Sequence, residues 1–218
     1  PQFDRVAVFA LYSADGKIPD TTVYYLTGLK KVVDNIVVVG DNPIFPDEAR
    51  KLESLVCHYS FARHGEYDFG SYKRGWLYVM GHEELRKAAE LVFCNDSCYA
   101  PVQPFENVFR QMEPRQLDFW GMCSNLDIQY HIQSYFWVLK RKVFESPAFA
   151  GYMRKIKREA TVREVVLNYE VPFTKAMQDA GFTVDAFINF TMPANEIPRI
   201  YRNNPTAAPV YCMENGSP

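Results

Sequence analysis

The sequence predicts an α/β fold with a mostly parallel central sheet flanked by helices. Three apolar runs rich in Val, Ile and Phe predict strands at residues 5–12, 35–40 and 56–61. Helical spacing of apolar residues separates these runs, over 23–33 and 46–55. A fourth run, 91–94, lacks polar alternation, as expected of a strand covered on both faces. Strands that alternate with helices in this way become parallel neighbours in one sheet.

The remaining elements are predicted from caps, breakers and periodicity. Ser146 and Pro147 form a cap and first-turn pair, and Thr161 with Glu164 forms a capping box. Pro172 interrupts the helix that this box begins, so we expect broken helical hydrogen bonding near 168–171. Further helices are predicted within 63–80, 82–89, 102–112, 147–156 and 172–180, and further strands at 117–122, 131–139 and 182–188. The tail from Pro193 shows no clear pattern.

Composition favours a packed globular protein and disfavours some function classes. Hydrophobic residues make up 48% of the 218 residues, and the formal net charge of −2 argues against a nucleic-acid partner. No apolar run approaches 18 residues, so no transmembrane helix is expected, and no signal-peptide pattern is found. The five cysteines lack paired metal-ligand spacing and are expected to be reduced, as in a cytoplasmic protein. With no linker visible, we expect one domain over residues 1–218.

A polar sequence follows the fourth apolar run. The strand at 91–94 ends in Asn95, Asp96 and Ser97, before a turn at Pro101. Ligands of such sheets bind beyond the carboxyl ends of the strands. A carboxylate there can hold a divalent cation, and the cation can hold a diphosphate. The alternative is that these side chains only cap a loop or the next helix.

The segment 63–75 places glycines and acids at the opening of a helix. Glycine lets a ligand approach the backbone, and a helix N-terminus attracts phosphate. The segment contains no G-x-G-x-x-G fingerprint, and a closely packed turn explains the glycines equally well.

Two other sequence features leave alternatives open. Glu170 lies at the break that Pro172 causes, where a carboxylate serves either in chemistry or as a helix cap. A basic run closes the helix 147–156, and it forms either a solvated face or a contact with anionic lipid. This run consists of Arg154, Lys155, Lys157 and Arg158.

Several blocks, taken together and in order, resemble the rhamnan synthesis protein F family, which is assigned to rhamnose transfer in bacterial cell-surface polysaccharide synthesis. The blocks run over about residues 5–205, and each is weak alone. They are VAVFA at 6–10, DGKI at 15–18, YDFGSYKRG at 67–75, NDSCY at 95–99, DFWG at 118–121, HIQSYF at 131–136, YEVPFTK at 169–175 and AGF at 180–182.

The resemblance implies a single GT-A-type glycosyltransferase domain, with a nucleotide-sugar half at about 1–100 and an acceptor half at about 101–205. Donor contacts are implied at Tyr12, Asp41, Tyr67, Asp68, Gly70, Lys73, Asn95 and Asp96. Asp96 matches the metal-binding position of an Asp-x-Asp motif, so a Mg²⁺ or Mn²⁺ cofactor is implied. Glu170 matches the general base of an inverting transfer. Asn95-Asp96-Ser97 has one acid rather than two, and Glu170 replaces the commoner Asp.

The chemistry of glycosyl transfer agrees with these roles. Negative charge develops on the leaving diphosphate, and a cation on Asp96 would stabilise it with help from Lys73 or the 67–75 amides. Glu170 would take the proton from the acceptor hydroxyl. Asp41 is expected either to contact the ribose or base of the donor or to close a turn. The aromatic strand at 131–139 would form a sugar-facing wall. The acceptor contacts expected are Asp118, Trp120, His131 and Gln133, although His131 serves equally well as a core or rim histidine.

The implied partners are a nucleotide-diphosphate sugar, with dTDP-rhamnose suspected from the family name, and a glycan or lipid-linked glycan acceptor. A peripheral contact with the inner face of the membrane fits that acceptor. A catalytically silent GT-A-like module that binds glycan or protein is the alternative, because the motif at residues 95–97 has a single acid. A nucleotidyltransferase would need more acids around the metal.

Overall fold

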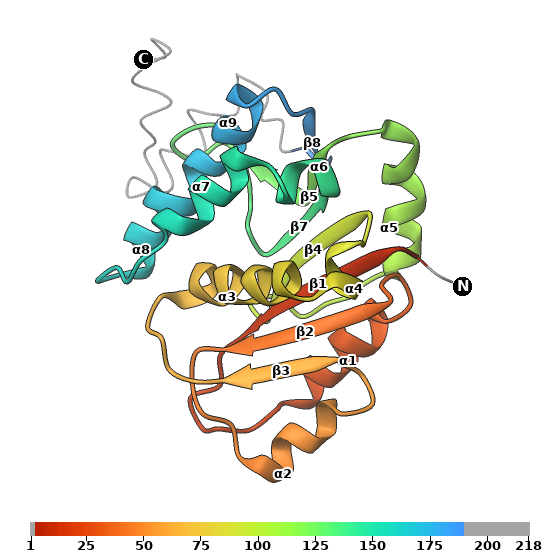
Figure 1. Cartoon of the computed structure of the whole chain (residues 1–218), viewed down its shortest axis with the longest axis vertical. Helices are drawn as coiled ribbons and strands as arrows, with labels where there is room; N and C mark the ends of the chain where they lie inside the picture. The colour runs from red at the N-terminus through yellow and green to blue at the C-terminus, as the bar shows by residue number, and fades with distance from the viewer. Residues whose placement is uncertain (1–2, 190–218) are drawn as a thin grey trace, which may run out of the picture.

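The computed structural model describes residues 3–189 (Figure 1). Their strands form one sheet in the order β3-β2-β1-β4-β7-β5-β6. In addition, β8 pairs with β5 on the edge opposite β7. The strands are β1 (Arg5–Leu11), β2 (Asn35–Gly40), β3 (His58–Phe61), β4 (Glu90–Asn95), β5 (Phe119–Asn125), β6 (His131–Ile132), β7 (Phe136–Lys140) and β8 (Val184–Ile188).

The first half of the sheet is parallel and the second half is mixed. β3, β2, β1 and β4 run in the same direction, and β7 is antiparallel to β4. β5 is antiparallel to β7 and therefore points the same way as β4. All seven residues of β1 are buried, as its apolar sequence predicts. The predicted α/β class with a mostly parallel sheet is confirmed, and the carboxyl ends of β1, β2 and β4 meet at one edge.

Helices cover both faces of this sheet. α3 (Tyr67–Gly81), α7 (Pro147–Lys155) and α9 (Val171–Asp179) pack on one face, and α3 crosses in front of β1 and β2 in Figure 1. α1 (Asp20–Leu29) and α5 (Phe105–Met112) pack on the other. The shorter segments are α2 (Pro46–Ala49), α4 (Glu83–Arg86), α6 (Arg141–Phe144), α8 (Val162–Val165), the 3-10 turns Arg50–Leu52 and Glu113–Arg115, and a π-helix, Val166–Glu170. No helix within the described range is long and apolar enough to cross a membrane.

The caps read from the sequence are confirmed, and several predicted helices are shorter than expected. Ser146 accepts a hydrogen bond from Phe149 N, and Thr161 and Glu164 form both bonds of the capping box. The helix expected at 102–112 begins at Phe105, directly after Pro104. The helix expected at 46–55 gives way to a 3-10 turn after Ala49. The tail from Pro193 lies outside the described residues.

The continuous aromatic strand predicted at 131–139 is wrong, and its buried aromatic residues do not form a sugar-facing wall. This stretch is two short strands, β6 and β7, because residues 133–135 leave the sheet between them. Trp137 is buried and stacks on Phe173 of α9 with 4.2 Å between ring centroids. The aromatic side chains of β7 therefore belong to the core, and the link at 133–135 lies between the two strands.

The helix break predicted at Pro172 is replaced by a π-helix. Glu170 and Val171 keep right-handed helical dihedrals, so the chain runs from α8 through Val166–Glu170 into α9 without leaving the helix. Proline has no N–H to donate to the preceding turn, and a wider turn accommodates that loss. Glu170 thus lies at the end of a π-turn that continues directly into α9, which begins at Val171.

Candidate active site at the carboxyl edge of the sheet

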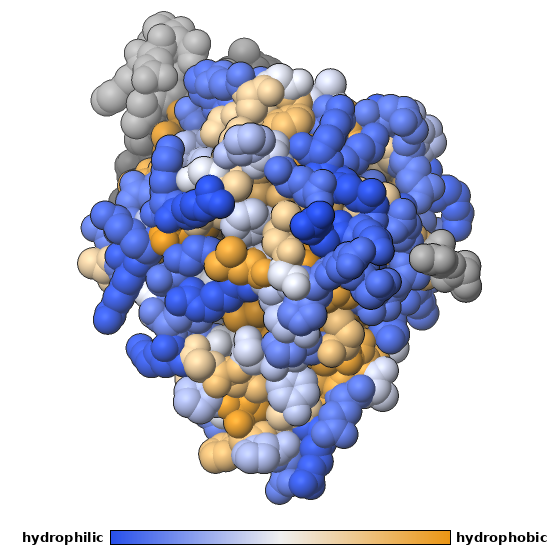
Figure 2. Space-filling view, in the orientation of Figure 1, coloured by the Kyte–Doolittle hydropathy of each residue, from blue (hydrophilic) through white to orange (hydrophobic). Residues whose placement is uncertain are grey.

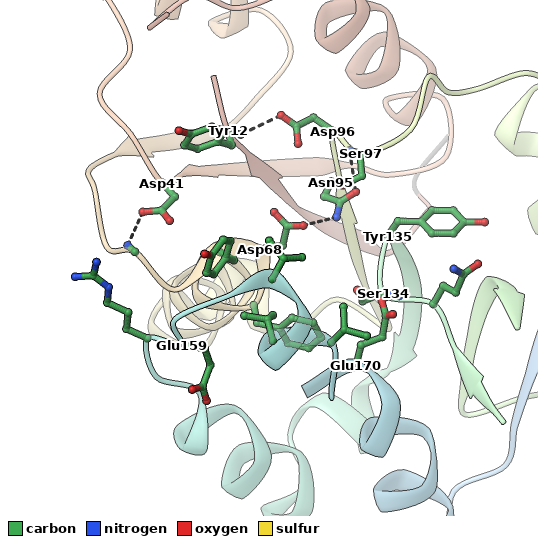
Figure 3. Close-up of a pocket in the computed structure, with 18 of the residues that line it drawn as sticks. Tyr12, Asp41, Asp68, Asn95, Asp96, Ser97, Ser134, Tyr135, Glu159 and Glu170 are labelled. Atoms are coloured by element: carbon green, nitrogen blue, oxygen red, sulfur yellow. Dashed lines mark hydrogen bonds between the residues drawn. The ribbon is translucent and has the colours of Figure 1, made fainter. Parts of the chain in front are cut away.

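A cavity of about 890 Å³ opens at the carboxyl ends of β1, β2 and β4 (Figure 3). The opposite wall comes from the link between β6 and β7 and from α8 with the π-helix. Side chains from both halves of the chain therefore face one space, which is the usual place for a ligand in an open α/β sheet. Of the predicted site residues, those that line it are Tyr12, Asp41, Tyr67, Asp68, Asn95, Asp96, Gln133 and Glu170.

Asn95 and Asp96 join three elements at the end of β4. Asp96 Oδ2 accepts a hydrogen bond from Tyr12 N at 2.9 Å, which ties β4 to the end of β1. Asn95 Nδ2 donates to Asp68 Oδ2 at 2.7 Å, and Asn95 Oδ1 accepts from Ser97 N at 3.1 Å. Asp96 therefore serves in part as a structural cap at the end of β4, and it also lines the cavity.

Asp68 is a carboxyl group that the protein makes hard to ionise. Burial, and next the negative charge of Asp96, raise its pKa to about 6, while the Asn95 hydrogen bond opposes the shift. Burial also raises the pKa of Asp96 above its ordinary value. Repulsion between two partly desolvated carboxylates is the situation that a bound cation relieves.

The Asp68 and Asp96 carboxylates fit a hard divalent cation, because carboxylate oxygens are its preferred ligands. Among residues 3–189 there is no group of three His, Cys, Asp or Glu side chains arranged to hold a metal. A cation of the Mg²⁺ type commonly uses one or two carboxylates and takes its other ligands from substrate phosphates and water. The two carboxylates therefore suit a cation that enters together with a phosphate ligand.

Asp41 fixes the loop between β3 and α3. Its Oδ1 accepts hydrogen bonds from His64 N at 2.6 Å and Gly65 N at 2.7 Å. Tyr67, which begins α3 and lines the cavity, has a φ of 55°. A non-glycine residue in this conformation is uncommon and is held there by its surroundings. The loop is therefore tightly built, and Asp41 serves as its anchor as well as facing the cavity.

Glu170 faces the cavity from the opposite wall. Ser134 donates to Glu170 Oε2 through its backbone N, at 2.7 Å, and through its hydroxyl. His131 Nε2 lies 3.6 Å from Glu170 Oε1. Burial alone would raise the pKa of Glu170, but the bonds from His131 and Ser134 outweigh it and lower the pKa. The carboxylate is thus kept ionised at neutral pH, as a proton acceptor must be.

His131 acts as a partner of Glu170 and does not line the cavity. It is 2% exposed, and its Nδ1 lies 2.9 Å from Gln129 O. Burial favours its neutral form, but the bonds to Glu170 and Gln129 O raise the pKa of the imidazole. The interpretation of His131 as a satisfied buried histidine describes it better than direct sugar contact, and Gln133 remains a candidate acceptor contact.

Gly70 and Lys73 do not line the cavity, although both were expected to contact a donor. A Cβ built on Gly70 would lie 2.3 Å from Glu66 Cβ and 2.8 Å from the His64 ring, so this glycine permits packing within the protein. Lys73 Nζ donates to Ile156 O at 2.6 Å and pairs with Glu66 at 2.8 Å. The packing alternative for the glycine-bearing segment is correct at Gly70.

Asp118 and Trp120 also lie away from the cavity. Asp118 directly precedes β5, and its backbone O accepts from Lys140 N, which pairs in register with Glu90 at the start of β4. Asp118 is therefore at the opposite edge of the sheet from Asp96, where it pairs with Lys142 at 2.7 Å. Trp120 is 5% exposed and packs edge-on against Phe109. The expected acceptor contacts at these two residues do not fit their positions.

Several cavity residues were missed by sequence reasoning. Ser134 holds Glu170, and its position next to Gln133 in a polar link was the available signal. Arg158 was included only as one member of a basic run, and Arg63 and Glu159 had no signal beyond lying near other candidates. The missed lining residues include Arg63, Gly65, Ser134, Tyr135, Arg158 and Glu159.

Curated relatives match parts of the chain. It is 28% identical over 156 residues to the uncharacterized protein y4gN of Sinorhizobium fredii, a match that covers 69% of this chain and 40% of that protein. It is 31% identical over 96 residues to the virulence protein VirA of Vibrio anguillarum, a match that covers 42% of this chain and 30% of that protein. The matches thus span well under half the length of these relatives.

Solved structures share the fold at low sequence identity. A 4-diphosphocytidyl-2C-methyl-D-erythritol synthase from Anaerococcus prevotii matches with a TM-score of 0.52 and 11% identity, over 92% of this chain and 98% of that one. Core-mannan synthase A from Aspergillus fumigatus matches with a TM-score of 0.47 and 12% identity, over 84% and 72%. The first of these likenesses supports the nucleotidyltransferase-like α/β architecture and says nothing further about activity.

The family comparison covers most of the chain. Residues 36–214 match rhamnan synthesis protein F, a span that includes the carboxylates of Asp41, Asp68, Asp96 and Glu170. It also includes both walls of the cavity, except for the end of β1. The chain belongs to the rhamnan synthesis protein F family.

Proposed function

We propose that this chain is an inverting glycosyltransferase that moves a sugar from a nucleotide-diphosphate donor to a glycan. The observation that carries the proposal is the pair of unlike carboxylate sites on opposite walls of one cavity. Asp68 and Asp96 lie on the wall built by β4 and α3, and Glu170 lies on the wall built by the π-helix. One wall suits the diphosphate and its cation, and the other suits the incoming hydroxyl.

The first wall supports departure of the diphosphate. When bound, a divalent cation supplies charge neutralisation of the leaving group. Asp68 and Asp96 would be its protein ligands, and the Asn95 amide and Tyr12 N keep the two carboxylates in place. Asp41, whose carboxylate accepts hydrogen bonds from His64 N and Gly65 N, is the candidate contact for the ribose or base of the donor.

The second wall supports attack by the acceptor. Glu170 takes the proton of the acceptor hydroxyl as that oxygen forms its bond to the anomeric carbon, and the bond from this carbon to the diphosphate oxygen breaks. The proton ends on Glu170 and the electron pair on the diphosphate. No covalent sugar–enzyme species is formed in this single displacement, so the configuration at the anomeric carbon inverts.

Family membership supports rhamnose as the sugar and a dTDP-linked donor, and it supports a cell-surface polysaccharide acceptor, free or lipid-linked. We assign residues 1–100 mainly to the donor and 101–205 mainly to the acceptor. A lipid-linked acceptor would bring the protein to the inner face of the membrane. The basic residues at the end of α7 would then lie close to anionic headgroups.

The test combines donor screening with one isosteric substitution. Thermal-shift measurements against nucleotide-diphosphate sugars, with and without Mn²⁺, identify the donor. Transfer by Glu170→Gln is then compared with wild type, and NMR of the product gives the anomeric configuration. We expect a loss in rate of roughly 10²–10⁴-fold, the usual share of general-base catalysis, with donor affinity little changed.

Glu159→Gln is the matched control. Glu159 lines the same cavity, but its carboxylate accepts hydrogen bonds from the Tyr169 hydroxyl and Asn168. Its substitution should leave the rate within a few-fold of wild type. Retained configuration in the product, or equal rates for Glu170→Gln and wild type, would contradict the inverting role of Glu170.

A silent binding module is the second candidate, favoured by one observation. The motif at the end of β4 has a single acid, and one oxygen of that acid is already bonded to Tyr12 N. A silent module would bind the nucleotide sugar or the glycan with no transfer and no effect of Glu170→Gln on affinity. Binding without product, for the donor that the screen identifies, would support this candidate.

A further inference from the structure

Arg63 and Arg158 line the cavity and have no partner of their own among the described residues 3–189. Arg63 lies in the loop after β3, and Arg158 lies in the link between α7 and α8. Neither side chain makes an ion pair or hydrogen bond to any residue in the 3–189 range. Their neighbours in the same region differ, because Lys73 and Arg74 are both held by Glu66 at 2.8 and 2.7 Å.

The two arginines lie in the corner of the cavity that Asp41 organises. A Cβ built on Gly65 would be 3.4 Å from Arg158 Nε, so the guanidinium packs directly against this loop residue. Gly65 N in turn donates to Asp41 Oδ1 at 2.7 Å. Arg63 precedes Gly65 by two residues and lines the same space. This corner is separated from Glu170, which lies on the opposite wall in Figure 3.

The charges of the cavity require a cationic contact for any phosphate ligand. Of the residues that the structure describes, five acidic ones line it, namely Asp41, Asp68, Asp96, Glu159 and Glu170, against two basic ones, Arg63 and Arg158. A diphosphate that enters this space meets repulsion unless it reaches positive groups. Guanidinium groups bind phosphate oxygens in a planar, two-point geometry, and unpaired ones lose no ion pair in doing so.

We propose that Arg63 and Arg158 form an anion clamp for the diphosphate of the nucleotide donor, apart from the cation site at Asp68 and Asp96. The proposal rests on the proposed function and deepens it, because it names the groups that recognise the phosphates. It also assigns a donor contact to the second half of the chain. Arg158 lies among exposed basic residues, and hydrophilic side chains with some apolar ones between them cover the region of α7 and α8 (Figure 2).

The clamp explains how a motif with one acid can serve a nucleotide sugar. Arg63 and Arg158 would share with the cation the charge that develops on the leaving diphosphate. Because they come from segments nearly a hundred positions apart, phosphate binding would also hold the α7–α8 link against the β3–α3 loop. The donor would then be enclosed between the two halves of the chain.

Calorimetric titration separates phosphate recognition from base recognition. Wild type, Arg63→Ala, Arg158→Ala and the double variant are titrated with dTDP, UDP and GDP, and with the matching nucleosides, at fixed Mg²⁺. We expect each single substitution to weaken binding of the preferred diphosphate by roughly 10-fold or more, as for other hydrogen bonds to charged groups. Nucleoside affinity should stay the same, and the salt dependence of diphosphate binding should become shallower.

Arg154→Ala is the matched control, because Arg154 is exposed at the end of α7 and lies outside the cavity. It should bind every ligand as wild type does. Unchanged diphosphate affinity in the double variant, or an equal loss for nucleoside and diphosphate, would overturn the clamp and leave the proposed function intact. If wild type binds none of the three diphosphates, the proposed function fails, and the clamp fails with it.

Discussion

Asp68 and Glu170 line the same cavity, yet their surroundings shift their pKa values in opposite directions. Burial and the charge of Asp96 raise the pKa of Asp68 to about 6, and Asn95 offers the opposing hydrogen bond. Burial acts on Glu170 in the same sense, but His131 and two bonds from Ser134 lower its pKa. Because desolvation acts on both carboxyl groups in the same direction, their partners account for the opposite directions of the shifts.

This contrast assigns different chemistry to the two walls. Groups whose environments push their pKa values apart are the usual signature of divided roles in one site. A carboxylate that is costly to ionise gains from a cation, whereas one kept ionised by neutral and cationic donors can accept a proton. Four tests examine this division, from the largest expected effect to the smallest.

Asp96→Asn should have the largest effect, because it removes half of the negative charge that a cation would meet. The amide oxygen can still accept from Tyr12 N, so the fold should survive. We expect turnover to fall by about 10³-fold, in line with the several kcal/mol that a metal ion contributes to such reactions. Initial rates over a Mn²⁺ titration measure it. Wild-type turnover would remove Asp96 from the cation site, and a large fall in the melting temperature would make it a structural cap.

Gly70→Ala tests whether the wall that carries Asp68 depends on packing. The new Cβ would meet Glu66 and the His64 ring well inside contact distance. We expect a loss of about 1–3 kcal/mol in the free energy of unfolding, measured by denaturant titration. Gly151→Ala in α7 is the control, because nothing lies within 4 Å of its Cβ position and the helix should be stabilised. Equal stability of the two variants would contradict the packing role of Gly70.

His131→Asn tests the partner that helps to shift the pKa of Glu170 in the direction opposite to that of Asp68. Loss of the imidazole removes a cause that lowers the pKa of Glu170, so that pKa rises. Because the base must be ionised, the acid limb of the kcat/KM profile should move to higher pH. At pH values below the pKa, the rate should fall about tenfold for each pH unit by which the limb moves. An unmoved profile with a uniformly lower rate would leave His131 with a packing role only.

The smallest effects expected are opposite changes in stability. Asp68 has a folded pKa above its unfolded value, so its ionisation destabilises the fold at neutral pH and is without effect below both values. Glu170 has a lowered folded pKa, so its carboxylate stabilises the fold above the unfolded value, and that contribution disappears as pH falls through the folded pKa.

At about pH 8, Asp68→Asn should therefore raise the melting temperature by about 2–4 °C per kcal/mol recovered, and Glu170→Gln should lower it. Both differences should shrink as the pH falls toward about 4, close to the ordinary pKa values of the two side chains. Scanning calorimetry at the two pH values measures them. Changes of the same sign at pH 8 would break the contrast between the two walls.

The strand half of the fold and the strand-end residues could be predicted because their signals are local. Buried parallel strands are continuous apolar runs, and Asp41 and Asp96 directly follow two of them. Glu170 was found through Pro172 and the family resemblance, although the sequence did not distinguish a helix break from a π-turn. Proline marks a disturbance of the hydrogen bonds but does not say how the turn absorbs it.

The failures concern direction and distance in space. Asp118 follows the same pattern of polar residue beside an apolar strand, but it precedes β5 and so lies at the other edge of the sheet. Lys73 points to Ile156 O, which is 83 positions away and has no sequence signal. Arg154 and Arg158 are the same residue type in the same basic run, and only the path of the α7–α8 link places Arg158 in the cavity.

The π-turn at Val166–Glu170 also sets the rotational phase of everything that follows it. An α-helix advances about 100° per residue, so removing one residue here to restore α-helical spacing would turn α9 by about that angle. The hydroxyl of Thr174, which accepts from Ile132 N at 2.9 Å, would leave β6, and Phe173 would leave Trp137. A single-residue deletion in this segment should therefore be far more damaging than a substitution at any of its exposed positions. Insertions and deletions among relatives should avoid it.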